Sequence, residues 1–167
     1  MRRAAAALAV AMVLAAACRA DAPTYEEHSL GGAVVVAHWD GDRDQPAIRV
    51  LFEPSLDGYH MYALDFDPAT TQGIGVPTRI DVEGGWAVTG SITADRPVEM
   101  LEYPSLGVEL PVYPPGVVTF TIPVAPAASA TAADATVRLT FALCSANRCL
   151  KTQRDVRLLV DGRPPEA

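Results

Sequence analysis

The sequence predicts an all-β fold, an immunoglobulin-like β-sandwich that forms a single domain after an N-terminal signal. Fourteen Pro and twelve Gly interrupt the 167 residues, which disfavours long helices and favours short strands joined by turns. Half of the residues are hydrophobic, so a real core can form. About eight or nine strand-like segments follow one another at the spacing typical of sandwiches. A small barrel or a jelly roll is the alternative architecture.

In the predicted strands, apolar residues alternate with polar ones, or β-branched and aromatic residues are enriched. These strands are Ala33 to His38, Ala47 to Phe52, Gly58 to Phe66, Val76 to Val82, Trp86 to Ile92, Val98 to Tyr103, Val117 to Val124, Thr136 to Cys144, and Cys149 to Val160. Turns rich in Gly and Pro separate them. Residues 125–133 predict a loop. We therefore place the domain at residues 31–162 and a tail at residues 163–167.

Residues 1–17 predict a signal peptide for the general secretion pathway. Arg2 and Arg3 give a positive start, and an uninterrupted apolar run follows from Ala4 to Ala17. That run is shorter than the roughly 20 apolar residues that span a bilayer. The arginine pair lacks the flanking residues of a twin-arginine signal. We therefore expect a protein of the periplasm or cell envelope.

Cys18 follows three small residues, and this ending resembles a bacterial lipobox, although the preferred Leu stands one place early. In a lipobox the cysteine becomes the acylated first residue, and the lipid holds the protein on a membrane surface. Ordinary signal-peptidase cleavage is the alternative, because the alanines also satisfy the small-x-small rule. Either outcome leaves residues 18–30 as a flexible tether and leaves two cysteines to pair in an oxidising compartment.

The composition argues against two other classes of function. The net charge of −7 does not attract a phosphate backbone, so we expect no nucleic-acid partner. Three scattered histidines (His28, His38 and His60) and two cysteines show no metal-ligand spacing. We therefore predict no metal site and no cofactor.

Cys144 and Cys149 flank a loop of four residues, Ser145 to Arg148, which favours a β-hairpin with the cysteines directly opposite each other. A non-hydrogen-bonded antiparallel pair brings Cα atoms to about 4.5 Å, within disulfide range. Alternation predicts that both cysteines lie on the polar faces of their strands, off the core. The residues predicted to face the core are Val137, Leu139, Phe141, Leu143, Val156, Leu158 and Val160.

Such a disulfide has two possible roles. As a staple of so short a loop it would stabilise the fold by only about 2 kcal/mol. As a redox site it would sit at an accessible hairpin end, where Arg148 and Lys151 favour the thiolate form. The residues alone leave both roles open.

Three segments together resemble the N-terminal periplasmic domain of the DsbD thiol:disulfide interchange proteins. They are the aromatic strand Asp57 to Tyr62, the turn Gly73 to Thr78, and the cysteine hairpin Phe141 to Leu150. The order and spacing match from about Ala33 to Val160. The resemblance implies an immunoglobulin-like sandwich, in agreement with the strand pattern.

The resemblance also implies a function. Domains of this family pass reducing equivalents from a membrane electron carrier or a thioredoxin-like protein to oxidised envelope proteins, without a cofactor. This would make the chain a protein-disulfide reductase or a component of thiol–disulfide exchange. Cys149 would form the mixed disulfide, and Cys144 would resolve it. His60 and Tyr62 would face the disulfide.

The sequence departs from the family pattern in three ways. The loop that shields the family's disulfide corresponds to Tyr103 to Gly107, in which only Tyr103 and Leu106 would act as a lid. Leu150 and Lys151 replace two prolines. We find neither the transmembrane section nor the thioredoxin-like domain of the full-length family protein, so we expect a stand-alone domain that acts with separate proteins. The alternative is a binding or structural envelope lipoprotein with an inert hairpin disulfide.

Overall fold

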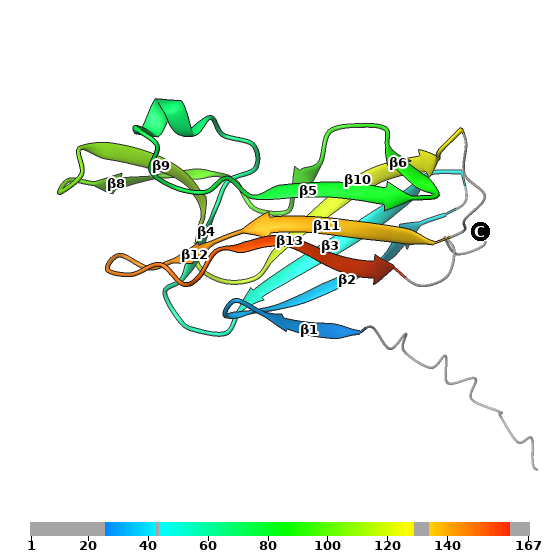
Figure 1. The fold of residues 1–167 in the computed structure, drawn as a ribbon, viewed down its shortest axis with the longest axis horizontal. Helices are drawn as coiled ribbons and strands as arrows, with labels where there is room; N and C mark the ends of the chain where they lie inside the picture. The colour runs from blue at the N-terminus through cyan, green and yellow to red at the C-terminus, as the bar shows by residue number, and fades with distance from the viewer. Residues whose placement is uncertain (1–25, 43, 129–133, 161–167) are drawn as a thin grey trace, which may run out of the picture.

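A computed structural model describes residues 26–42, 44–128 and 134–160. Its strands form an immunoglobulin-like β-sandwich, as the sequence predicts (Figure 1). Every pairing between two named strands is antiparallel. The predicted signal peptide with Cys18, the tail, and part of the predicted loop at 125–133 lie outside the described residues.

The larger layer is a six-stranded sheet in the order β1-β2-β3-β10-β6, with β7 also paired to β10. Its strands are β1 (Glu27–Leu30), β2 (Ala33–Gly41), β3 (Pro46–Pro54), β6 (Trp86–Val88), β7 (Thr93–Ala94) and β10 (Val118–Pro126). The expected tether at residues 18–30 is therefore wrong for its last four residues, because these pair with β2.

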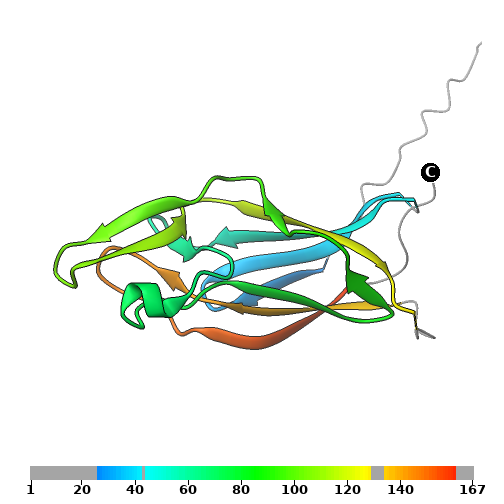
Figure 2. The ribbon, with the colours of Figure 1, turned by 90° about the horizontal axis from the view of Figure 1, so that it is seen from above.

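The facing layer is a three-stranded sheet in the order β13-β11-β5, and the two layers are visible in Figure 2. Its strands are β5 (Arg79–Gly84), β11 (Ala135–Phe141) and β13 (Gln153–Val160). The core between the layers includes Phe52, Phe120 and Phe141, all at most 1% exposed. The ring of Phe52 lies edge-on to the other two, with centroids 5.7 and 5.1 Å away. The predicted inward face of β11 is confirmed.

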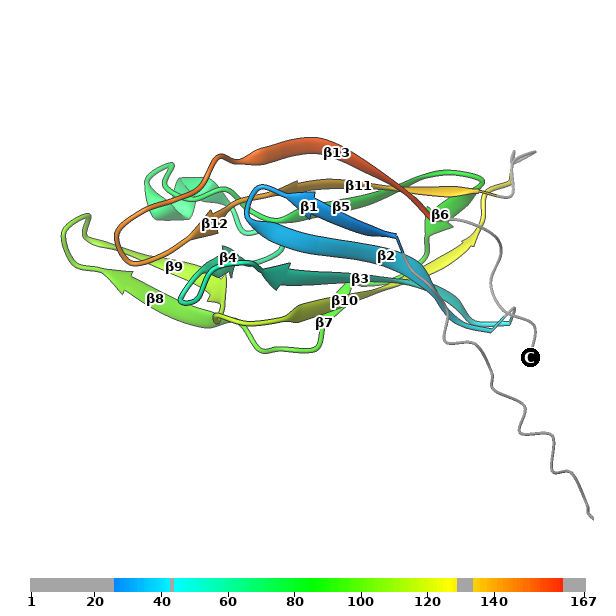
Figure 3. The same ribbon diagram turned by 90° about the horizontal axis from the view of Figure 1, so that it is seen from below.

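A third sheet extends one end of the sandwich, in the order β12-β4-β9-β8 (Figures 1 and 3). Its strands are β4 (His60–Tyr62), β8 (Glu99–Tyr103), β9 (Val108–Tyr113) and β12 (Leu143–Cys144), and the 3₁₀ helix η1 (Pro68–Thr71) follows β4. The C-terminal end of β13 lies at the opposite end of the molecule. The extension therefore carries both cysteines away from the end where β13 terminates.

Two strand predictions are wrong at their boundaries. The last strand begins at Gln153, four residues later than predicted, and residues 149–152 lie outside it. Within this strand, Leu139 pairs with Val156 but Phe141 pairs with Gln153, so two residues of β13 face Thr140 alone. This is a β-bulge, and Asp155 takes a left-handed φ of 53° there. The bulge reverses the alternation, so parity counted back from Val156 fails before Gln153.

No helix in the described ranges is long and apolar enough to cross a membrane.

Candidate functional site

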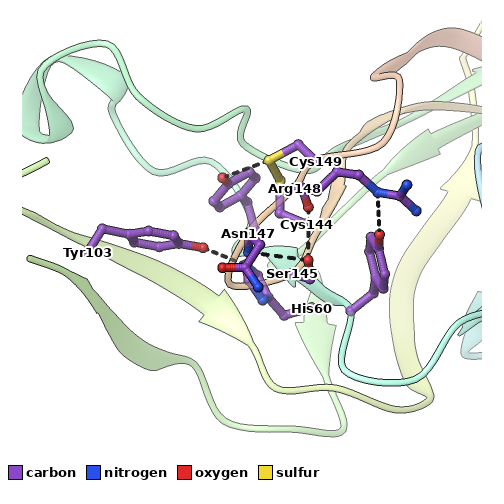
Figure 4. The surroundings of a disulfide bond; sticks show 9 residues. His60, Tyr103, Cys144, Ser145, Asn147, Arg148 and Cys149 are labelled. Atoms are coloured by element: carbon purple, nitrogen blue, oxygen red, sulfur yellow. Dashed lines mark hydrogen bonds between the residues drawn. A yellow bond between two sulfur atoms is a disulfide. The ribbon is translucent and has the colours of Figure 1, made fainter. Parts of the chain in front are cut away.

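Cys144 and Cys149 form a disulfide at the end of the third sheet, with Cα atoms 3.9 Å apart (Figure 4). The backbone N–H of Leu150 donates to the carbonyl of Leu143, and that of Ser145 donates to the carbonyl of Arg148, both at 2.8 Å. These bonds flank the cysteines on either side, which makes Cys144 and Cys149 a non-hydrogen-bonded antiparallel pair. The predicted hairpin with facing cysteines is thus what the structure contains.

The two sulfurs differ sharply in accessibility. Cys149 is exposed, whereas Cys144 is 0% exposed. The prediction that Cys144 lies off the core is therefore wrong. A chain approaching from solvent meets Cys149 first.

A second apolar cluster explains the burial of Cys144. Residues on the polar face of β11, such as Arg138, are open to solvent, but Cys144, further along the same face, lies beneath the third sheet. The cluster consists of Tyr62, Val108, Leu110, Val112, Ala142 and Cys144. Strand β9 supplies three of these side chains. Because the sequence analysis omitted β9 as a strand, it also missed this cover.

Tyr62 is the side chain that reaches the exposed sulfur. Its hydroxyl lies 3.8 Å from Cys149 Sγ. Burial, together with the neighbouring Tyr103, raises the pKa of Tyr62 to about 12, so the phenol keeps its proton at physiological pH. A protonated phenol at this position can donate a hydrogen bond to a Cys149 thiolate.

The turn before β5 holds Tyr62 in place. The Thr78 hydroxyl donates to the backbone carbonyl of Tyr62 at 2.6 Å, and Thr78 is 0% exposed. Gly75 adopts a φ of +90°, and a Cβ there would lie 3.0 Å from Phe66 Cζ and 3.4 Å from Tyr62 Cε1. The glycine-containing turn therefore has a physical task, which is to let the backbone approach the Tyr62 ring.

His60 links the disulfide hairpin to the β8–β9 hairpin. It pairs with Cys144 across the β4–β12 ladder, and its Nε2 lies 3.0 Å from the hydroxyl of Tyr103 (Figure 4). Burial lowers the pKa of His60 and raises that of Tyr103. Both side chains are therefore neutral at pH 7, and a neutral pair suits a buried hydrogen bond.

The other two supporting residues are placed differently from Tyr62 and His60. Leu106 is 49% exposed at the β8–β9 turn and is not part of the cluster around Cys144. The Arg148 side chain extends away from the sulfur atoms, and its Nε donates to the Tyr59 hydroxyl at 2.9 Å (Figure 4). The Arg148 charge is thus directed toward Tyr59 rather than toward Cys149.

Sequence reasoning missed Tyr59, Thr78 and Gly75 as parts of this site. Tyr59 is 7% exposed and anchors the hairpin loop through Arg148. The sequence did contain a signal, because all three residues lie in the segments that carry the family resemblance. Within residues 26–42, 44–128 and 134–160, no group of three or more His, Cys, Asp or Glu side chains could hold a metal ion.

An immunoglobulin-like sandwich that carries a cysteine hairpin on a small third sheet defines the structural class. Among solved structures, the chain is similar to the N-terminal domain of DsbD from Neisseria meningitidis, solved in the reduced form. The TM-score is 0.50 at 18% sequence identity, and the match covers 79% of this chain and 86% of that one. No protein-family model matches the sequence, and no curated protein matches it. The likeness shows a shared fold.

Proposed function

We propose that the chain is a thiol–disulfide interchange module of the cell envelope, with Cys149 as the attacking thiol and Cys144 as the resolving thiol. The observation that carries the proposal is the contrast between an exposed Cys149 and a buried Cys144 in one disulfide. The fold likeness to the DsbD domain supports the same role.

The exchange takes place in two steps. The Cys149 thiolate attacks one sulfur of an oxidised protein's disulfide, that S–S bond breaks, and the partner's second sulfur leaves as a thiolate. Cys144 then loses its proton and attacks Cys149 Sγ, which forms the intramolecular disulfide and releases the partner's other thiol. Two electrons pass from the dithiol to the partner. A thioredoxin-like or membrane electron-carrier protein restores the dithiol by the reverse exchange.

The surroundings suit this division of labour. The Tyr62 hydroxyl, 3.8 Å from Cys149 Sγ, is positioned to stabilise the attacking thiolate. Cys144, enclosed by apolar side chains, is protected from outside thiols, since burial in apolar surroundings keeps a thiol protonated and inert. The short hairpin keeps the resolving thiol beside the mixed disulfide, which favours fast release of the partner.

The proposal includes export. A signal peptide at residues 1–17 would deliver the domain to a compartment where a disulfide persists. Acylation of Cys18 would then hold it on a membrane surface. Oxidised envelope proteins are the substrates that this location provides.

Trapping tests the order of attack. In Cys144→Ser the resolving thiol is missing, so a mixed disulfide through Cys149 should accumulate with a thioredoxin-like partner and be visible on a non-reducing gel. In Cys149→Ser the remaining thiol is buried, and we expect no adduct. Equal trapping by both variants, or by neither, would refute the proposed roles.

The alternative is an inert staple in a binding or structural envelope lipoprotein. The complete burial of Cys144 is the observation that favours it, because buried sulfurs resist exchange. It predicts a reduction potential below about −300 mV and no adduct in either serine variant.

A further inference from the structure

Strand β8 is a free edge beside the disulfide. It pairs with β9 on one side and ends the order of the third sheet. Figure 3 shows it at the outer margin of the extension, at the same end as the cysteine hairpin. Met100 in its centre is 57% exposed. An exposed edge strand with an apolar side chain is a liability that soluble proteins usually cover, unless it serves as a binding surface.

The register shows which backbone groups face outward. The Pro111 carbonyl accepts a hydrogen bond from the Ala63 N–H at 2.9 Å, so the backbone groups of Pro111 face β4. Pro111 lies opposite Met100, which makes this a pair without hydrogen bonds between β8 and β9. The N–H and C=O of Met100, and by alternation those of Glu102, therefore point to the open side of β8. A second strand can bind these four groups.

A groove of about 410 Å³ joins this edge to the disulfide site. Its walls come from β8, from the proline turn after β9, from β4 and from the loop between the cysteines. The lining residues that matter here are Met100, Tyr103, His60, Pro114, Pro115 and Ala146. A chain segment lying along β8 would therefore lead directly to the cysteine hairpin.

The groove carries uncompensated negative charge. Glu99 and Glu102 both line it, and both are exposed. Neither forms an ion pair with any residue that the structure describes. Arg96 at its end already donates to the carbonyls of Pro114 and Pro115, at 3.3 and 2.8 Å. Two copies of this chain pairing through β8 would bring these carboxylates together, so the charges favour a basic occupant over a second copy.

We propose that the β8 edge and its groove bind an extended, basic segment of the oxidised protein, which adds to the sheet as a strand and presents its disulfide to Cys149. Backbone hydrogen bonds to Met100 and Glu102 would supply affinity, and lysine or arginine side chains opposite Glu99 and Glu102 would supply selectivity. This inference rests on the proposed function, because it names the substrate class of that site.

A binding experiment without thiol chemistry tests the surface by itself. The probe is a fluorescent peptide of alternating valine and lysine with serine in place of cysteine, titrated by anisotropy into the full chain in its oxidised form. We expect the same peptide, N-methylated at the alternate amides that face β8, to bind about tenfold more weakly, because it loses two neutral hydrogen bonds. Equal binding of the two peptides, or no binding by the unmethylated one, would overturn the inference.

Charge variants give a second, matched comparison. Glu102→Lys should weaken binding of the lysine peptide several-fold and strengthen that of a valine–glutamate peptide. Glu53→Lys makes the same change in net charge at an exposed position of β3, outside the groove, and should leave both affinities unchanged. Equal effects of the two substitutions would overturn the inference, because they would show attraction by net charge alone.

Exchange with a cysteine form of the peptide separates this inference from the proposed function. The cysteine is joined to glutathione, so attack by Cys149 forms the peptide mixed disulfide and releases glutathione thiolate. Reduction of this peptide faster than its N-methylated counterpart supports both proposals. Strand-dependent binding of the serine peptide without reduction of the cysteine peptide would support the docking surface and refute the redox role.

Discussion

Tyr62 is the residue on which the reactivity of Cys149 most depends. Its protonated hydroxyl, 3.8 Å from the sulfur, favours the thiolate, so Tyr62→Phe should raise the pKa of the reduced thiol. Loss of a hydrogen bond to a charged group should slow alkylation by iodoacetamide near pH 7 by roughly tenfold. Tyr59→Phe is the matched control, because that hydroxyl bonds Arg148 instead. Identical pH–rate curves for Tyr62→Phe and wild type would contradict this assignment.

His60 makes stability depend on pH in a defined direction. Burial lowers its pKa below the ordinary value of 6.5, so as pH falls the unfolded chain takes up its proton first. The free energy of unfolding therefore decreases as pH falls below about 6.5 and levels off below the folded-state pKa. His60→Gln should reduce this decrease, measured by urea unfolding between about pH 7 and pH 5. His38 shifts in the same direction, so some decrease should remain.

In that comparison, His60→Gln keeps a side chain able to bond Tyr103 but removes the titration. An unfolding free energy that falls as steeply in the variant as in wild type would show that His60 does not contribute. His38→Gln in the same background should remove the second contribution.

At the residue scale the sequence predicts the paired cysteines and places His60 and Tyr62 beside them. It cannot predict that Arg148 turns toward Tyr59, because a long side chain on a hairpin loop has many rotamers and its choice depends on a neighbour 89 positions away. The burial of Cys144 is likewise a property of the cover and not of the strand that carries it.

At the scale of elements, the turn from Gly73 to Thr78 positions Tyr62. Gly75→Ala combines an unfavourable φ with contact at 3.0 Å to Phe66, so it should destabilise the fold by about 1–3 kcal/mol and slow Cys149 alkylation. Gly73→Ala tests the backbone term alone, since Gly73 also has positive φ (+79°) but nothing lies within 4 Å of its added Cβ. Chemical denaturation of both variants measures the difference. Equal destabilisation would mean that contact with the aromatic rings is unimportant.

Strand prediction succeeded where alternation was uninterrupted and failed where it was broken. Val108, Leu110 and Val112 alternate along β9, but Pro111 argues against a strand. The structure tolerates that proline because its backbone groups face the end of the short strand β4, not β8. The bulge at Asp155 is a similar case, since an extra residue leaves no mark in the alternation of polar side chains.

At the scale of the whole molecule, the sandwich is a rigid base and the third sheet is the working end. Proline and glycine content with alternating segments was enough to predict the sandwich, because these features report directly on turns and on one buried face. The third sheet could not be predicted, because its strands have two to six residues and pair far from their neighbours in sequence. The free edge of β8 and the cover over Cys144 both arise from that sheet.

The reduction potential of the Cys144–Cys149 couple, measured by equilibration with glutathione buffers, tests the central claim most directly. An interchange module must be reducible by a thioredoxin-like donor, so the account predicts a potential well above about −300 mV. A potential below that value, with no exchange through Cys149, would identify the disulfide as a structural staple and contradict the account.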